Sequence, residues 1–169
     1  MRFLHFYFAG LALVIIGSAS ANPVIASRDW PTYINVLHHY HICYPVRILT
    51  PQGETDNSAG QAFRAIDGAE LQVYAWFDGE GSSLSQNLLS AAATSAGRRG
   101  KIRNRSVGRG WGNASGETGH GQLFYIKMFK RDDRIVKAEF RYPKAASTRY
   151  KPVIDRISHC FGLSLDLDP

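Results

Sequence analysis

Hydrophobic and polar residues alternate with a period of two over much of the chain, which predicts a protein built mainly from β-strands. The clearest stretch is the pair 121–131 and 134–142, which is interrupted only by two aspartates. Residues 61–66 and 70–77 alternate in the same way around an Asp-Gly turn, whose glycine supplies the positive φ of a tight hairpin. Strands joined by such short turns run antiparallel, so a mainly antiparallel sheet is expected.

Shorter alternating segments occupy other parts of the chain. A first strand signal covers residues 33–36 and resumes at 40–44. Residues 51–60 contain two glycines and several Asx and serine residues, which predict a loop. Two further short strands are expected at 102–107 and 111–115, on either side of a glycine-rich turn.

Two segments have the periodicity of amphipathic helices. Ser82 or Ser83 can cap the first helix and Gly97 ends it, with an apolar stripe made of Leu84, Leu88, Leu89 and Ala92. The second covers about 145–161 and contains Pro152, so it either begins just before the proline or is kinked by it.

The layers follow from these elements. The strand at 70–77 is apolar on one face and aromatic on the other, so we expect helices to cover both faces of the sheet. The sequence therefore predicts an α+β domain, a mainly antiparallel sheet flanked by two helices.

The start of the chain has the composition of an export signal. Arg2 is followed by an apolar run, and Ala19-Ser20-Ala21 matches the small residues that signal peptidase accepts. We expect a signal peptide at 1–21, with an uncleaved anchor as the alternative, and a single domain at 22–169. No other stretch approaches the roughly 20 apolar residues of a membrane span, so a soluble periplasmic or secreted protein is expected.

The chain contains two cysteines, Cys43 and Cys160. Two thiols in a small exported domain are expected to pair, which would join the first strand to the last helix.

The formal net charge is +6, and much of the excess lies between residues 98 and 109. This basic segment, interrupted by glycines, consists of Arg98, Arg99, Lys101, Arg103, Arg105 and Arg109. It could bind phosphates or an anionic envelope polymer. The alternative is a solvated loop and edge strand whose arginines keep another strand from docking. Trp111, set between two glycines beside the arginines, is the aromatic residue that we single out as a candidate ligand contact.

Histidines are the main enzymatic candidates. His39 and His41 on one strand face, beside His38, could ligate zinc or copper if His120 or a carboxylate came close, but their spacing favours a surface strand that is rich in histidine, and no metal is expected. His120 as general base with Glu117 as partner and the arginines on a phosphate would make a secreted hydrolase or nuclease. No nucleophile elbow, phosphate-binding loop or paired-acid motif accompanies them, so we expect no catalysis and no cofactor.

Several segments resemble proteins of the PsbP-like fold. They are Asn35…Tyr40-x-Ile42-x-Tyr44-Pro45, the strand Phe124-Tyr125-x-Lys127, and Tyr142-Pro143 followed by Arg149-Tyr150 and a terminal helix. The loop Pro51-Gln52-Gly53-Glu54-x-Asp56-Asn57 is similar to that of an uncharacterised group of small exported bacterial proteins. Where PsbP-like sequences have Gly-Phe, this chain has His39-Tyr40.

The resemblance implies an antiparallel sheet flanked by helices that works as a non-catalytic accessory or binding module. Its partner would be an envelope protein or an anionic polymer, and not a specific nucleic acid. An interaction protein that neutralises or escorts a partner protein is a further alternative.

Overall fold

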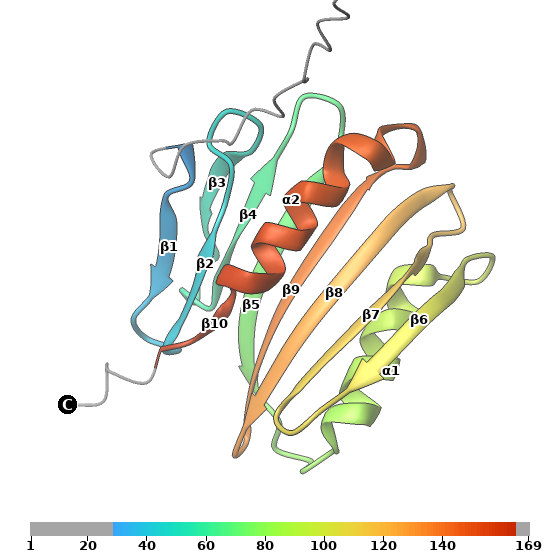
Figure 1. The fold of residues 1–169 in the computed structure, drawn as a ribbon. Coiled ribbons are helices and arrows are strands. Elements are labelled where there is room, and N and C mark those ends of the chain that lie inside the picture. The colour runs from blue at the N-terminus through green and yellow to red at the C-terminus, as the bar shows by residue number, and fades with distance from the viewer. Residues whose placement is uncertain (1–28, 165–169) are drawn as a thin grey trace, which may run out of the picture.

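A computed structural model describes residues 29–164, so the signal peptide expected at 1–21 lies outside the described range (Figure 1). The strands are β1 (Thr32–Asn35), β2 (Tyr40–Cys43), β3 (Thr50–Glu54), β4 (Gly60–Arg64), β5 (Glu70–Phe77), β6 (Lys101–Val107), β7 (Trp111–Glu117), β8 (Gln122–Arg131), β9 (Arg134–Pro143) and β10 (Gly162–Leu163). The helices are α1 (Leu84–Ala96) and α2 (Ser147–Cys160), the latter preceded by a short 3-10 turn at Lys144–Ala146.

Two antiparallel sheets make up the β-structure. The larger has seven strands in the order β3-β4-β5-β9-β8-β7-β6, and the smaller has the order β1-β2-β10. All strand pairs in both sheets are antiparallel. The expected α+β class is therefore confirmed.

The two helices lie on opposite faces of the large sheet, as expected, but over different strands. α1 packs on β6, β7 and β8, whereas α2 packs on β8, β9 and the small sheet (Figure 1). Along β8 the residues Phe124, Ile126 and Met128 are buried beneath α1, while the alternate residues Tyr125 and Phe129 point to the α2 side. As a result, α2 leaves β6 and β7 uncovered on its own side.

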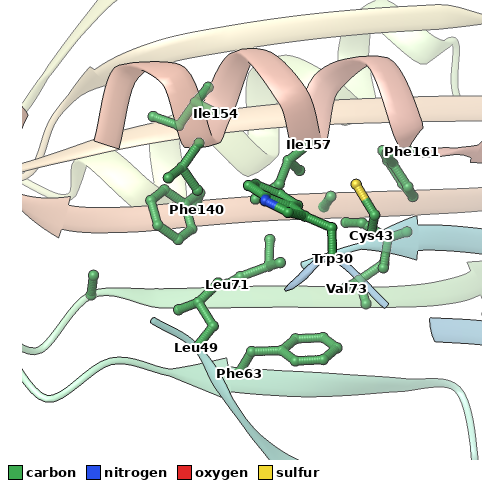
Figure 2. Packing of buried hydrophobic residues seen from close by; sticks show 14 of the residues in the cluster. Trp30, Cys43, Leu49, Phe63, Leu71, Val73, Phe140, Ile154, Ile157 and Phe161 are labelled. Atoms are coloured by element: carbon green, nitrogen blue, oxygen red, sulfur yellow. The ribbon is translucent and has the colours of Figure 1, made fainter. Parts of the chain in front are cut away.

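The larger core lies between α2, the small sheet and β4, β5 and β9. Figure 2 shows Trp30 and Cys43 pointing toward Ile157 and Phe161 of α2, with Leu71 on the sheet beneath them. Burying a large apolar side chain stabilises a fold by about 1.5–3 kcal/mol, so this cluster anchors α2 against the sheet.

Local sequence explains the limits of α1. The hydroxyl of Ser83 accepts a hydrogen bond from the backbone N–H of Gln86, whose side chain reaches back to the backbone of Ser83, and this capping box starts the helix. Gly97 ends it with a φ of +67°, which favours glycine. The buried face differs from the expected apolar stripe: Leu89 is 47% exposed, and the buried face includes Ser95 near the end of the helix.

α2 begins at Ser147, so the interpretation that it starts just before Pro152 is wrong. The proline lies inside the helix and removes the hydrogen bond that residue 152 would donate to Thr148. The helix tolerates this because its buried face, which includes Tyr150 and Val153, is held by the larger core.

Three further strand details differ from expectation. Residues 33–36 and 40–44 do not form one interrupted strand but the hairpin of β1 and β2, closed by a turn at 36–39. The expected loop at 51–60 begins as the edge strand β3, in which Pro51 is tolerated because only one side of the strand is paired. The third difference is β10, which no pattern predicted and which extends the small sheet beside β2.

Candidate functional site

The first part of the basic segment converges with a lysine from a distant part of the chain at one end of the large sheet. Cross-strand pairing places Lys101 opposite Glu117, Glu117 opposite Leu123, and Leu123 opposite Tyr142. Lys144 directly follows β9, so it lies at the same end. We call this surface the cationic end; it consists of Arg98, Arg99, Lys101, Arg103, His120 and Lys144.

A hollow of about 320 Å³ lies in the cationic end, where α1 ends. Arg98, Arg99 and His120 line it. The backbone N–H of Gly119 donates to the carbonyl oxygen of Ala96 (2.9 Å), which brings the loop of His120 beside the two arginines. Among residues 29–164, no acid lines this hollow and none forms a salt bridge with either arginine. The hollow is therefore suited to an anionic group.

Glu117 is paired with two cations. Its carboxylate pairs with Arg103 (2.6 Å) and with Lys144 (3.0 Å). Hydrogen bonds from these two side chains hold the pKa of Glu117 below its usual value. Glu117 does not line the hollow that contains His120, so the structure does not bring together the acid–base pair that a hydrolase would require.

The six basic residues of the sequence segment do not form one patch. All six are exposed. The pairing of β6 with β7 shifts by one residue at Arg103, which has no partner on β7, so the residues of β6 on either side of it change the face to which their side chains point. Arg105 consequently lies on the opposite face, where its guanidinium donates to Ser85 of α1 (3.2 Å). Arg109 lies in the turn at the far end of β6, roughly 20 Å along the strand. Of the expected anion-binding segment, the first four basic residues therefore remain candidates for one site, and Lys144 is added to them.

The uncovered side of β7 is the second feature of the site. Gly112, Ala114 and Gly116 are buried beneath α1, whereas Asn113 and Ser115 point to the α2 side and are partly exposed. Trp111 lies on that side as well and is 38% exposed. α2 does not extend over β7 (Figure 1). The strand therefore presents its alternate side chains to solvent. We call this surface, formed by β6, β7 and β8 on the α2 side, the open face.

Two hollows lie where the open face meets α2. One, of about 470 Å³, is lined by Tyr125, Tyr142 and Ser115 from the sheet and by residues 147–155 of α2, which include Lys151 and Asp155. The other, of about 370 Å³, is lined by Tyr125, Trp111 and Asn113 and by the end of α2. Tyr125 contributes to both, so the two hollows adjoin along the helix, and we call them together the groove. Binding pockets for small ligands have similar volumes, about 300–1,000 Å³.

The clustered histidines do not form a metal site. His39 takes a φ of +52° in the turn between β1 and β2, so it does not share a strand face with His41, contrary to expectation. His41 is hydrogen-bonded through Nδ1 to Ser164 (3.0 Å), and His38 is buried. Among the described residues, no three His, Cys, Asp or Glu side chains are grouped closely enough to hold a metal ion.

A disulfide joins Cys43 at the end of β2 to Cys160 at the end of α2, with the Cα atoms 5.8 Å apart. Disulfides persist in oxidising compartments, so this bond points to a protein that works outside the cytoplasm. No helix within residues 29–164 is long and apolar enough to cross a bilayer.

Sequence reasoning missed Lys144, Tyr142 and the polar residues of the open face. Lys144 could not be assigned to the basic segment, because only the β8–β9 hairpin brings it there. A signal for the open face was present in β7, where the small residues Gly112, Ala114 and Gly116 alternate with larger ones. Such alternation indicates one closely packed face and one free face.

Comparison with known proteins gives a structural likeness alone. No protein-family model matches the sequence, and no curated protein matches it. The solution structure of cyanobacterial PsbP (CyanoP) from Synechocystis sp. PCC 6803 superposes with a TM-score of 0.60 and 12% sequence identity, over 88% of this chain and 98% of that chain. The resemblance drawn from the sequence is confirmed at the level of architecture: this chain has the PsbP-like α+β fold.

Proposed function

We propose that the protein is an exported, non-catalytic binding module of the cell envelope, periplasmic or secreted, which holds an anionic polymer at its cationic end. The observation that carries this proposal is the hollow lined by Arg98, Arg99 and His120, in which no acid of residues 29–164 neutralises the two arginines. Arg103 and Lys144 lie at the same end of the sheet and share a single carboxylate, that of Glu117. This excess of positive charge favours a polymer of acidic groups.

The arrangement favours binding over catalysis. A hydrolytic site needs a base oriented by a third group, with donors placed around the developing charge. His120 is exposed and its backbone, not its ring, bonds to Thr118 (3.3 Å). Glu117, the nearest candidate partner in sequence, is committed to two cations. The PsbP-like fold and the disulfide fit an accessory module outside the cytoplasm, which is where an envelope polymer is found.

The proposal is tested by the affinity of the purified exported protein for polygalacturonate and for inorganic polyphosphate at increasing salt. The double variant Arg98→Gln/Arg99→Gln should weaken both affinities roughly 2- to 30-fold at low salt, because each exposed charge contact contributes about 0.2–1 kcal/mol. The matched control is Arg47→Gln/Arg64→Gln, which removes the same charge from two exposed arginines that do not line the hollow; Arg64 lies on β4, four strands from β7. It should retain the affinity of the unchanged protein.

Equal losses in the two double variants would show that binding follows net charge alone, and the proposed site would be wrong. The hydrolase alternative is tested with the same polymers and with RNA. Product formation that His120→Ala abolishes in a folded protein would replace the binding proposal with an enzymatic one.

A further inference from the structure

We propose that the open face binds the sugar rings of an acidic polysaccharide, and that the cationic end holds the carboxylates of the same chain. The inference rests on the proposed function and adds the chemical class of the polymer. It is carried by the side chains of the open face, which combine one exposed and several partly buried aromatic rings with neutral hydrogen-bonding groups.

Three aromatic side chains face the groove. Trp111 is 38% exposed at the outer side, and Tyr125 and Phe129 are partly buried between it and α2. Cross-strand pairing places Trp111 directly opposite Phe129 on the same face. A flat ring of this kind offers apolar area to the C–H face of a sugar while its edge stays in water. Tyr142 provides a fourth ring in the hollow nearer the cationic end.

Neutral polar side chains occupy the spaces between these rings. Asn104 pairs with Ser115, and Ser106 pairs with Asn113, in two cross-strand rows that continue onto β8. Amides and hydroxyls both donate and accept hydrogen bonds, which matches the hydroxyl groups of a sugar. The amide Nδ2 of Asn104 lies 3.4 Å from Oγ of Ser115, which is long for a hydrogen bond. This weak bond can be exchanged for one to a ligand hydroxyl.

The groove and the cationic end are continuous. Ser115 lines the hollow nearer the cationic end and lies two residues before Glu117, on the same face of β7. Lys144 follows Tyr142 by two residues, just beyond the end of β9. The α2 side of this hollow contains Lys151 and Asp155, one charge of each sign. A polymer lying in the groove therefore passes from a surface of little net charge to a basic one, which favours a chain of sugars with acidic substituents.

The distribution of charge argues against a nucleic acid. Single-stranded nucleic acids carry a phosphate on every unit, and proteins that bind them line the whole groove with positive charge. Here the middle of the groove contains Lys127, whose ammonium group already donates to the carbonyl oxygen of Ser158. Lys151 in the other hollow is offset by Asp155, and the β7 side chains Asn113 and Ser115 are neutral. Acidic sugars with neutral hydroxyls between their charges match this pattern better.

Calorimetric titration of the exported protein with three probes tests the inference: an oligogalacturonate, inorganic polyphosphate and a single-stranded oligodeoxynucleotide. Trp111→Ala should weaken oligogalacturonate binding roughly tenfold and leave polyphosphate binding unchanged. The matched aromatic control is Phe77→Ala, since Phe77 is 57% exposed at the end of β5 and lines neither hollow of the groove. The control should bind all three probes as the unchanged protein does.

Each outcome has a distinct meaning. If Trp111→Ala leaves oligogalacturonate binding intact while Arg98→Gln/Arg99→Gln weakens it, this inference is wrong and the proposed function stands. If no probe binds the unchanged protein, both are wrong. If Trp111→Ala weakens binding of the oligonucleotide more than binding of the oligogalacturonate, the open face binds a nucleic acid and the inference is overturned.

A second measurement does not depend on any variant. In the unchanged protein, the side-chain amide resonances of Asn104 and Asn113 should shift on addition of oligogalacturonate but not of polyphosphate. Unshifted resonances at saturating oligogalacturonate would refute a sugar site on the open face.

Discussion

The substitution Glu139→Gln tests how α1 is held against the sheet. Glu139 is only 3% exposed, on the α1 side of β9. Its carboxylate accepts a hydrogen bond from Ser95 of α1 (2.6 Å) and pairs with Lys137 (2.6 Å) and Arg141 (2.6 Å). Because α1 leads directly into the cationic end, this network also positions that surface.

The expected loss of stability is large. Lys137 is itself 6% exposed, so an uncharged residue 139 leaves its ammonium group buried without a counter-ion. Removing one partner of a buried ion pair typically costs about 3–5 kcal/mol, against a total stability of about 5–15 kcal/mol for a domain. The matched control is Glu70→Gln, because Glu70 pairs with the exposed Arg64 at 3.4 Å. The control should cost less than about 1 kcal/mol.

The pH dependence gives an independent check. Burial alone would raise the pKa of Glu139, but the charge of Lys137 and the hydrogen bonds from Lys137 and Ser95 outweigh it and lower that pKa. A carboxyl with a lowered pKa in the folded state contributes stability above its unfolded pKa of about 4.5 and loses it as pH falls through the folded value. The difference between the unchanged protein and Glu139→Gln should therefore be full at neutral pH and shrink below pH 4.5.

Urea denaturation followed by circular dichroism measures both effects, since the free energy of unfolding falls linearly with urea concentration. If Glu139→Gln costs no more than Glu70→Gln at pH 7, the network does not stabilise the fold. A difference between the unchanged protein and Glu139→Gln that stays constant down to pH 3 would contradict the lowered pKa of Glu139.

Two further predictions concern the framework. The disulfide of Cys43 and Cys160 links residues that are 117 positions apart, so replacing both cysteines by serine should lower the free energy of unfolding by about 4–5 kcal/mol. Labelling of two free thiols per chain, unfolded without a reductant, would show that the bond is absent. At Gly60 an added Cβ would lie 2.0 Å from the carbonyl oxygen of Val73, so Gly60→Ala should cost about 1–3 kcal/mol or more in urea denaturation, whereas Gly79→Ala, with no atom within 4 Å, should change stability by less than about 0.5 kcal/mol. Equal costs at the two glycines would contradict the close packing of β4 on β5.

The parts of the fold that the sequence predicts well depend on local signals. The β8–β9 hairpin follows from alternation on both sides of two aspartates, and Asp132 takes the positive φ of +56° that the turn needs. The limits of α1 follow from the capping box at Ser83 and from Gly97. In each case the residues that determine the turn or the helix end lie at that turn or end itself.

The missed elements lack such signals. The turn between β1 and β2 contains no glycine, proline or asparagine, and His39 takes its positive φ because the pairing of the flanking strands requires it. β3 contains Pro51 and Gly53, which are typical of loops, and it forms because β4 offers a free edge. β10 is only two residues long, too short for any periodicity.

The candidate site can be predicted only in part from the sequence. The exposure of Arg98 and Arg99 follows from their charge and neighbouring glycines. The contact of Glu117 with Lys144 spans 27 residues and depends on the register of three strands. The open face depends on where α2 lies: helices cover both faces of the sheet, as the aromatic alternation indicates, but tertiary packing places α2 over β9 and leaves β7 free.

A crystal structure of the exported protein with a bound oligogalacturonate would show whether the cationic end and the groove bind one polymer. We expect carboxylates of the oligosaccharide against Arg98 and Arg99, with sugar rings continuing along the groove beside Trp111. An oligosaccharide bound elsewhere, such as at the separate hollow lined by Arg131 and Arg134 in the β8–β9 turn, would contradict this expectation.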